Sequence, residues 1–194
     1  MNKSKILSRD CPILCKKIYL RQLSQNDSRK LSGAANSYEV ASQIGSDFTF
    51  PHPYTDEDAK RFIAAAASAR AKGEEYHFGI FVRGSNALAG MVGLREIDKE
   101  RHTAEIGYWL NPSFWGNNYA YEASREVLSF AFDKIGLNVV YATTFAFNKR
   151  SINLLRRLKF SAPEVAHGLF IHDSKIAHAI SMSLTRFSWE AQFR

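Results

Sequence analysis

The sequence contains one stretch whose residue types and spacing suit a phosphate-binding site. It consists of Trp115, Gly116, Asn117, Asn118, Tyr119 and Ala120, between a predicted strand and a long predicted helix. The first N–H groups of a helix have no partner within the helix, and the helix dipole adds positive potential there. A turn of small residues, or of residues that tolerate a left-handed backbone, lets a phosphate approach those groups. The pattern therefore predicts an anion site, although many strand–turn–helix junctions bind nothing.

The predicted strand before this turn presents two different faces, because side chains alternate along a strand. One face carries Ala104, Ile106, Tyr108 and Leu110, and the other carries Glu105, Gly107 and Trp109. An acid, a glycine and a tryptophan together suit a ligand-facing surface with room for close approach of a backbone. For Trp109, packing in the core is the alternative interpretation.

The elements that must position these residues follow from hydrophobic periodicity and from turn signals. The predicted strands are residues 17–23, 76–82, 87–97, 102–110, 138–147, 160–172 and 176–187, with Asp173-Ser174 as the turn of the last hairpin. The predicted helices run towards Asn36 from a cap at Asn26-Asp27, and over residues 38–44, 59–71, 119–135 and 148–158. Thr55 is a good helix cap, and Gly73 and Gly136 are helix stops. This order predicts one α/β (α+β) domain with a single mixed sheet and helices on its faces.

Composition and charge limit the function classes. The chain has 194 residues, of which 45% are hydrophobic and 13% aromatic, so it can bury a substantial core. The formal net charge is +7 and is concentrated in residues 1–21 and 148–160. Such a surplus fits a nucleic acid, an acidic partner, a phosphorylated ligand or simply solvated surfaces. Phe145 and Phe147 beside Lys149 suit base stacking, but alternating strand aromatics are more often core, which disfavours direct nucleic-acid binding.

The cysteines and the apolar runs indicate where the protein resides. Cys11 and Cys15 are the only cysteines, too few for a Cys-rich zinc site, and we expect reduced thiols in a cytoplasmic protein. No apolar run approaches the length of about 18 residues that a membrane helix needs, and no signal peptide is evident. His167 and His172 beside Asp173 suit a hairpin end better than a metal site, so no metal is expected.

Several correctly spaced segments resemble one known family. They are Tyr19–Leu23, Pro53–Ala59, Ala89–Leu94, Ala104–Pro112, Trp115–Ala123 and Asn148–Leu155. With them, residues 17–188 resemble the GNAT superfamily of acyl-CoA N-acyltransferases, in the branch that includes the ribosomal-protein N-acetyltransferases RimJ and RimL. The resemblance implies a single GNAT domain over residues 17–188, a flexible lead-in at 1–16 and a tail at 189–194. It also implies a mostly antiparallel sheet of about seven strands with helices on both faces and a splay between the fourth and fifth strands, where the cofactor's pantetheine arm inserts.

The family's cofactor signature, Gln/Arg-x-x-Gly-x-Gly/Ala, falls on Trp115–Ala120. Acetyl-CoA is thus the implied co-substrate, with Leu110 and Asn148 as further contacts. Asn118 stands where glycine is usual, but Asn tolerates the left-handed backbone better than most residues. Its side chain would either narrow the phosphate site or cap the helix. Asn148 likewise either binds the pantetheine chain or caps the following helix.

The reaction implied by the resemblance needs a base, a polarised thioester and a proton donor for the departing thiolate. Glu105 is the candidate base, directly or through water, and an ion pair or a surface carboxylate is the alternative. Ser151 is the candidate proton donor, with an ordinary first-turn position as the alternative. Two further departures lie downstream, where Arg156 replaces an acid and Lys159 replaces a glycine.

The implied function is an N-acetyltransferase that acts by direct attack of a primary amine on acetyl-CoA. The acceptor is either the N-terminal α-amine of a ribosomal or other protein or a small-molecule amine, with residues 48–54 expected to form part of its wall. The second hypothesis is a non-catalytic module that binds acyl-CoA or a partner. The sequence leaves the oligomeric state open, and a homodimer remains an alternative to a monomer.

Overall fold

The computed structural model describes residues 12–44, 50–167, 171–172 and 175–193. Within them, the chain forms an eight-stranded sheet in the order β1-β2-β3-β4-β5-β6-β10-β7. Its strands are β1 (Ile13–Leu14), β2 (Ile18–Arg21), β3 (Tyr76–Val82), β4 (Leu88–Asp98), β5 (Thr103–Leu110), β6 (Val139–Phe145), β7 (Glu164–Val165) and β10 (Ala179–Thr185). A separate pair joins β8 (Ile171–His172) to β9 (Lys175–Ile176). Only β5 and β6 pair in parallel in the large sheet as described, which confirms a mixed, mostly antiparallel fold.

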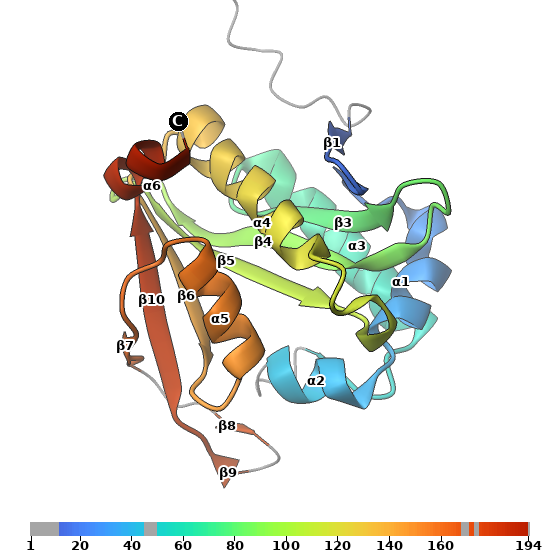
Figure 1. Ribbon diagram of the computed structural model, residues 1–194. Coiled ribbons are helices and arrows are strands. Elements are labelled where there is room, and N and C mark those ends of the chain that lie inside the picture. The colour runs from blue at the N-terminus through green and yellow to red at the C-terminus, as the bar shows by residue number, and fades with distance from the viewer. Residues whose placement is uncertain (1–11, 45–49, 168–170, 173–174, 194) are drawn as a thin grey trace, which may run out of the picture.

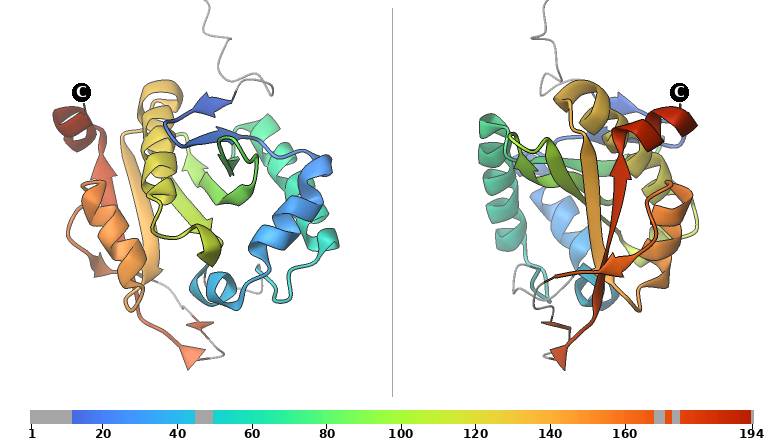
Figure 2. Two further views of the ribbon diagram at one scale, coloured as in Figure 1. Left: turned by 45° about the vertical axis from the view of Figure 1, so that its right-hand side comes forward. Right: turned by 90° about the vertical axis from the view of Figure 1, so that its left-hand side faces the viewer.

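Helices cover both faces of the sheet (Figure 1). They are α1 (Ser28–Ala35), α2 (Tyr38–Ile44), α3 (Asp56–Lys72), α4 (Tyr119–Ser129), α5 (Lys149–Arg157) and α6 (Arg186–Phe193), with short helical turns η1 (Gln25–Asp27), η2 (Pro112–Phe114) and η3 (Phe130–Ile135). α4, η3, α5 and α6 pack on one face in the larger apolar core. α1 and α3 pack on the other face in a second core. α2 lies apart from these two layers, below the open ends of β5 and β6 (Figure 2), and it contacts both strands.

β5 and β6 part in the middle of the sheet, as expected for the fourth and fifth predicted strands. Their pairing runs from Thr103 opposite Val139 to Glu105 opposite Tyr141 and then stops. β5 nevertheless continues to Leu110 and β6 to Phe145. Figure 1 shows the two strands pointing apart beyond the paired residues. The splay therefore lies between the last residues of the two strands.

Local signals explain most helix boundaries. Thr55 caps α3, with its hydroxyl accepting the N–H of Asp58, and Gly73 ends the helix at φ 68°. α4 continues through the π-helical turn η3 to Gly136, at φ 89°. The expected helix over residues 119–135 is thereby confirmed, with a widened last turn.

The two ends of the domain differ from expectation. Ile13–Leu14 were assigned to the lead-in but form β1, paired with β2 through Ile13 opposite Leu20. The predicted strand over 176–187 was wrong at its end, because α6 begins at Arg186 and buries Trp189 in the larger core. Of the described residues between 160 and 172, only Glu164–Val165 and Ile171–His172 form strands, the short β7 and β8. The predicted turn at Asp173-Ser174 lies outside the described residues, as do residues 1–11 of the lead-in and Arg194 of the tail.

None of the helices formed by the described residues is long and apolar enough to cross a membrane.

Candidate active site at the splay between β5 and β6

A tight bend opens α4 and leaves its first amides exposed. Gly116 has φ 79° and Asn118 has φ 70°, so the chain turns twice through the left-handed region before the helix starts. The first helical hydrogen bond runs from the N–H of Glu122 to the carbonyl of Asn118. Among the described residues, no acceptor is bonded to the N–H groups of Tyr119, Ala120 and Tyr121. These donors at a helix start form the group that suits a diphosphate.

Asn118 uses its side chain to bind a neighbouring helix. It makes no side-chain cap on α4, and its Oδ1 accepts a hydrogen bond from Nη2 of Arg157 at 2.8 Å. The expected left-handed backbone at this position is present, while the alternative of a side-chain cap is wrong. Arg157 also lies over the ring of Tyr121, 4.6 Å from its centroid, and Arg150 lies 4.1 Å from the centroid of Trp115. Two guanidinium groups of α5 therefore flank the bend and add positive charge beside its amides.

The bend is fixed to the end of β5. The indole Nε1 of Trp115 donates to the carbonyl of Leu110 at 2.9 Å. The side-chain amide of Asn117 donates to the carbonyls of Phe114 and Trp115, both at 3.2 Å. These bonds hold the turn without using the N–H groups that open α4. They also occupy the carbonyl of Leu110 in this conformation.

Glu105 lies where β5 and β6 separate. Its side chain is 12% exposed and pairs with Nη2 of Arg95 at 3.2 Å. The same oxygen, Oε1, accepts the backbone N–H of Thr143 at 3.2 Å. On the same face of β5, a Cβ added to Gly107 would meet no atom within 4 Å. Glu105 thus borders open space at the splay and is already hydrogen-bonded on one oxygen.

Trp109 belongs to the second core. Its ring is partly buried against that cluster and meets the ring of Phe50 edge-on at 5.8 Å. Phe50 in turn packs against Tyr54 at 4.9 Å. The expected wall over residues 48–54 is described from Phe50 onward, while Phe48 and Thr49 lie outside the described residues. An aromatic cluster therefore borders the same face of β5 as Glu105.

The other face of β5 meets the start of α5. Asn148 caps α5, because its Oδ1 accepts the N–H of Ser151 at 3.1 Å. Ser151 Oγ lies 2.8 Å from the phenol oxygen of Tyr108. Our sequence interpretation assigned no role to Tyr108, although a phenol between Ile106 and Leu110 on an apolar face is a signal that could have indicated one.

The two candidate proton-transfer groups thus lie on opposite sides of β5. Glu105 faces the side of α1 and α3, and Tyr108 with Ser151 lies on the side of α4 and α5. A group held in the splay between them would be accessible to a base from one side and to a proton donor from the other. The arrangement suits a displacement in which the nucleophile and the leaving group occupy different faces.

Comparison with known proteins gives the family. Residues 17–161 match the family described as Acetyltransferase (GNAT) domain. The chain belongs to the GNAT acetyltransferase family. This finding confirms the resemblance stated from the sequence.

Individual relatives agree with this assignment. "Uncharacterized N-acetyltransferase p20" of Bacillus licheniformis is 33% identical over 109 residues, which are 56% of this chain and 61% of that protein. "Probable N-acetyltransferase YjcK" of Bacillus subtilis is 31% identical over 156 residues, 78% of this chain and 84% of that protein. "Spermidine N(1)-acetyltransferase" of Escherichia coli is 25% identical over 177 residues, 91% of this chain and 84% of that protein. The solved ribosomal-protein-S5-alanine acetyltransferase from Vibrio fischeri superposes with a TM-score of 0.81 at 17% identity, covering 93% of this chain and 99% of that one, and so shares the fold.

The two positions at which the resemblance led us to expect glycine, Asn118 and Lys159, both have a left-handed backbone. Asn118 has φ 70° and Lys159 has φ 68°. Lys159 lies two residues after the last residue of α5. Its N–H bonds to the carbonyl of Arg156, and the N–H of Phe160 bonds to the carbonyl of Leu155. This pair of bonds is the Schellman arrangement, which favours glycine at the position of Lys159. Asn118 and Lys159 therefore hold a backbone conformation that glycine adopts more readily.

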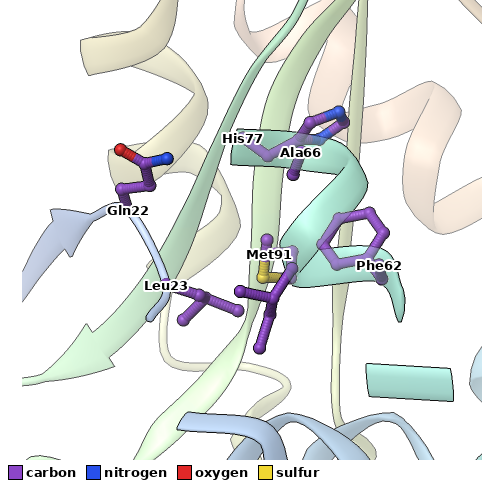
Figure 3. A pocket seen from close by; sticks show the side chains of 7 residues that line it. Gln22, Leu23, Phe62, Ala66, His77 and Met91 are labelled. Atoms are coloured by element: carbon purple, nitrogen blue, oxygen red, sulfur yellow. The ribbon is translucent and has the colours of Figure 1, made fainter. Parts of the chain in front are cut away.

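Two other hollows of the GNAT domain lie away from the splay. One is a small cavity between α3 and the sheet, beside Phe62, His77 and Met91 (Figure 3). Its volume of about 10 Å³ is no larger than a water site requires. Among the described residues, no group of three or more His, Cys, Asp or Glu side chains is placed to hold a metal.

The second hollow is a surface groove of about 420 Å³ between residues 15–17 and α4, and it reaches Asn118 at the bend. Burial, together with the nearby carboxylates of Glu126 and Glu122, raises the pKa of the Cys15 thiol to about 12. The thiol is therefore protonated at neutral pH and a poor nucleophile. Cys15 carries no disulfide.

Proposed function

We propose that this GNAT domain is an acetyl-CoA-dependent N-acetyltransferase that transfers an acetyl group directly to a primary amine. The observation that carries the proposal is the combination of open amides at the start of α4 with the adjoining splay of β5 and β6. The amides suit the diphosphate, and the splay suits a narrow pantetheine chain. Arg150 and Arg157 at the bend suit the negative charge of such a ligand. Acetyl-CoA would supply the acetyl group as a thioester.

The chain's own residues have distinct roles in this proposal. The carboxylate of Glu105 removes a proton from the acceptor's ammonium group, directly or through water, so that the amine can attack. The hydroxyl of Ser151 donates a proton to the departing sulfur from the opposite side of β5. The backbone amides of the bend orient the co-substrate, with Asn148 fixing the start of α5 that carries Ser151. A cytoplasmic location, expected from the sequence, is part of the proposal.

The acceptor is proposed only as a class, a primary amine. The relatives include a spermidine acetyltransferase and, among solved folds, a ribosomal-protein acetyltransferase. Protein N-termini and small amines are therefore the two acceptor groups to compare. The aromatic cluster of Phe50, Tyr54 and Trp109 would contact the acceptor beside the splay.

The first test measures binding. Coenzyme A and pantetheine are titrated separately into the full chain by calorimetry. Pantetheine lacks the diphosphate. We therefore expect it to bind more weakly than coenzyme A, by about tenfold or more for each charge-assisted hydrogen bond that is lost. Equal affinity for the two ligands would rule out a diphosphate site. The absence of saturable heat on titration with coenzyme A would overturn the proposal.

The second test measures transfer. The protein is incubated with acetyl-CoA and a panel of peptides with free N-termini, polyamines, amino sugars and amino acids, and free thiol is measured. We expect thiol release that depends on one acceptor class. Saturable binding of coenzyme A without acceptor-dependent release would instead identify the non-catalytic module.

A further inference from the structure

The hydroxyl group of Ser151 has one close side-chain partner among the described residues. The phenol oxygen of Tyr108 lies 2.8 Å from Ser151 Oγ and 3.4 Å from the carbonyl oxygen of Ser151. Tyr108 comes from the second half of β5, beyond its pairing with β6, and Ser151 comes from the first turn of α5. The contact therefore joins the two elements that border the splay on this face.

The hydrogen-bond geometry favours one direction for the proton. A phenol has one proton, and the nearer of its two acceptors is Ser151 Oγ. The carbonyl of Ser151 lies in the first turn of α5, where it can accept the helical bond from Leu155. When Tyr108 donates to Oγ, the serine's own proton must point to another acceptor. That orientation makes Ser151 a donor towards the splay.

Tyr108 is held in its protonated form. Burial raises the pKa of its phenol above the ordinary value, although the hydrogen bond with Ser151 lowers it in part. The ring packs against the larger core, so the oxygen has little freedom to move away from Ser151. Tyr108 thus stays a donor throughout the pH range of an ordinary assay.

We infer that Tyr108 is a positioning residue for this active site, whose phenol donates to Ser151 Oγ and thereby aims the serine hydroxyl proton at the sulfur of the departing thiol. The inference rests on the proposed function. In the step concerned, the carbon–sulfur bond of the thioester breaks and the sulfur takes the proton of Ser151. Ser151 Oγ then recovers a proton from water, either directly or through the phenol, which is itself reprotonated by water, and the donor pair returns to its starting form.

The test uses four forms of the full chain: the parent, Tyr108→Phe, Ser151→Ala and the double variant. With the best acceptor of the panel, Tyr108→Phe is expected to lower kcat about tenfold, a fraction of the effect of general acid catalysis. The KM for acetyl-CoA and the calorimetric affinity for coenzyme A stay at the parent's values, because the phenol does not hold the ligand. The double variant is no slower than Ser151→Ala, since Tyr108 acts through the serine.

A second readout needs no ligand. In thermal unfolding of the protein alone, the double variant should lose less stability than the two single variants together, because both remove the same bond.

Tyr76→Phe is the matched control for the kinetic measurement. Tyr76 is a partly buried tyrosine of β3 that packs on Phe130 at 5.1 Å, away from the splay. The Tyr76→Phe variant should leave kcat unchanged.

The outcomes separate this inference from the proposed function. If the parent transfers acetyl groups and Tyr108→Phe matches its kcat, or if the losses in kcat multiply in the double variant, the positioning role is wrong and the proposed function stands. If Tyr108→Phe weakens coenzyme A binding instead of slowing turnover, Tyr108 lines the ligand site and the inference is also wrong. If the parent neither binds coenzyme A nor transfers acetyl groups, the proposed function is wrong, and the positioning role is wrong with it.

Discussion

Glu105 accepts the backbone N–H of Thr143 just past the point where β5 and β6 stop pairing. Its Oε1 lies 3.2 Å from that nitrogen, two residues beyond the last paired position, Tyr141. A carboxylate therefore binds an N–H group that a continued strand ladder would have used. Glu105 therefore has two separable roles at the splay. It accepts a hydrogen bond from the N–H of Thr143, and it places an ionisable carboxylate beside the open space at Gly107.

Substitution of Glu105 distinguishes these properties. Glu105→Gln keeps an oxygen acceptor for Thr143 but cannot take a proton, so we expect unchanged coenzyme A affinity and a loss of kcat of about 100- to 10,000-fold. Glu105→Ala also leaves the N–H of Thr143 without a partner, at a cost of about 1–3 kcal/mol of unfolding free energy. It should therefore lower both stability and coenzyme A affinity. Calorimetry, thermal unfolding and thiol release measure the three effects.

Arg95→Gln is the control for the ion pair alone. The Arg95 side chain is 53% exposed, so its pairing with Glu105 contributes at most about 1 kcal/mol to stability. If Glu105→Gln retained the parent's kcat, Glu105 would act only as the acceptor that ends the pairing of β5 and β6.

Arg157 offers a prediction for the bend. Arg157→Ala removes the hydrogen bond to Asn118 and a positive charge beside the amides of α4. We expect coenzyme A affinity to fall about tenfold, the value of one charge-assisted contact, and the remaining affinity to depend less on salt. Arg156→Ala is the matched control, because Arg156 is the adjacent, exposed arginine of α5. Equal losses in the two variants would mean that net charge alone, rather than contact with the bend, accounts for the effect.

Lys159 has a backbone conformation that favours glycine, and its substitution measures the cost of that conformation. Lys159 has φ 68° at the end of α5, and a left-handed backbone costs a residue with a Cβ roughly 1–2 kcal/mol. Lys159→Gly should therefore raise the free energy of unfolding by about 1 kcal/mol and the Tm by about 2–4 °C. Lys149→Gly, at the helical start of the same element, should instead lower stability by about 1 kcal/mol. A decrease in Tm for Lys159→Gly would contradict the strain argument.

The bend and its helix could be predicted from the sequence, because local residue types determine them. Gly116 and Asn118 adopt the left-handed backbone that a close turn requires, and Tyr119 begins the helix. The bond between Glu105 and Thr143 could not be predicted, since it depends on where two strands 38 residues apart stop pairing. The contacts of Arg150 and Arg157 with the bend likewise depend on how α5 packs against α4.

The helix at the chain end was missed although its start carries a local signal. The strand alternation of Ile180, Met182 and Leu184 stops at Arg186, and the hydroxyl of Thr185 accepts the N–H of Ser188 at 3.1 Å, which caps α6. The packing of this helix could not be predicted, because it depends on the tertiary fold. Trp189 is 4% exposed and lies 5.8 Å from the ring of Phe132, and burial of this large aromatic side chain holds α6 against the larger core.

Acid stability should depend on Asp27, whose carboxylate binds Arg21 through both oxygens at 2.7 and 2.8 Å. Burial raises the pKa of Asp27, but the hydrogen bonds from Arg21 and Ser24 outweigh this effect and lower it to about 2. Because the pKa is lower in the folded state, its contribution is complete above the unfolded value of about 3.9 and is lost as the pH falls through about 2. The contribution is about 2 kcal/mol by linkage.

Asp27→Asn should therefore lower the free energy of unfolding by about that amount at pH 7. It should also remove most of the difference in stability between pH 4 and pH 2, measured by urea unfolding. Glu74→Gln, at a surface carboxylate 3.9 Å from Lys72, should keep the parent's pH dependence. If Asp27→Asn retained the full acid destabilisation, other carboxylates would have to account for it.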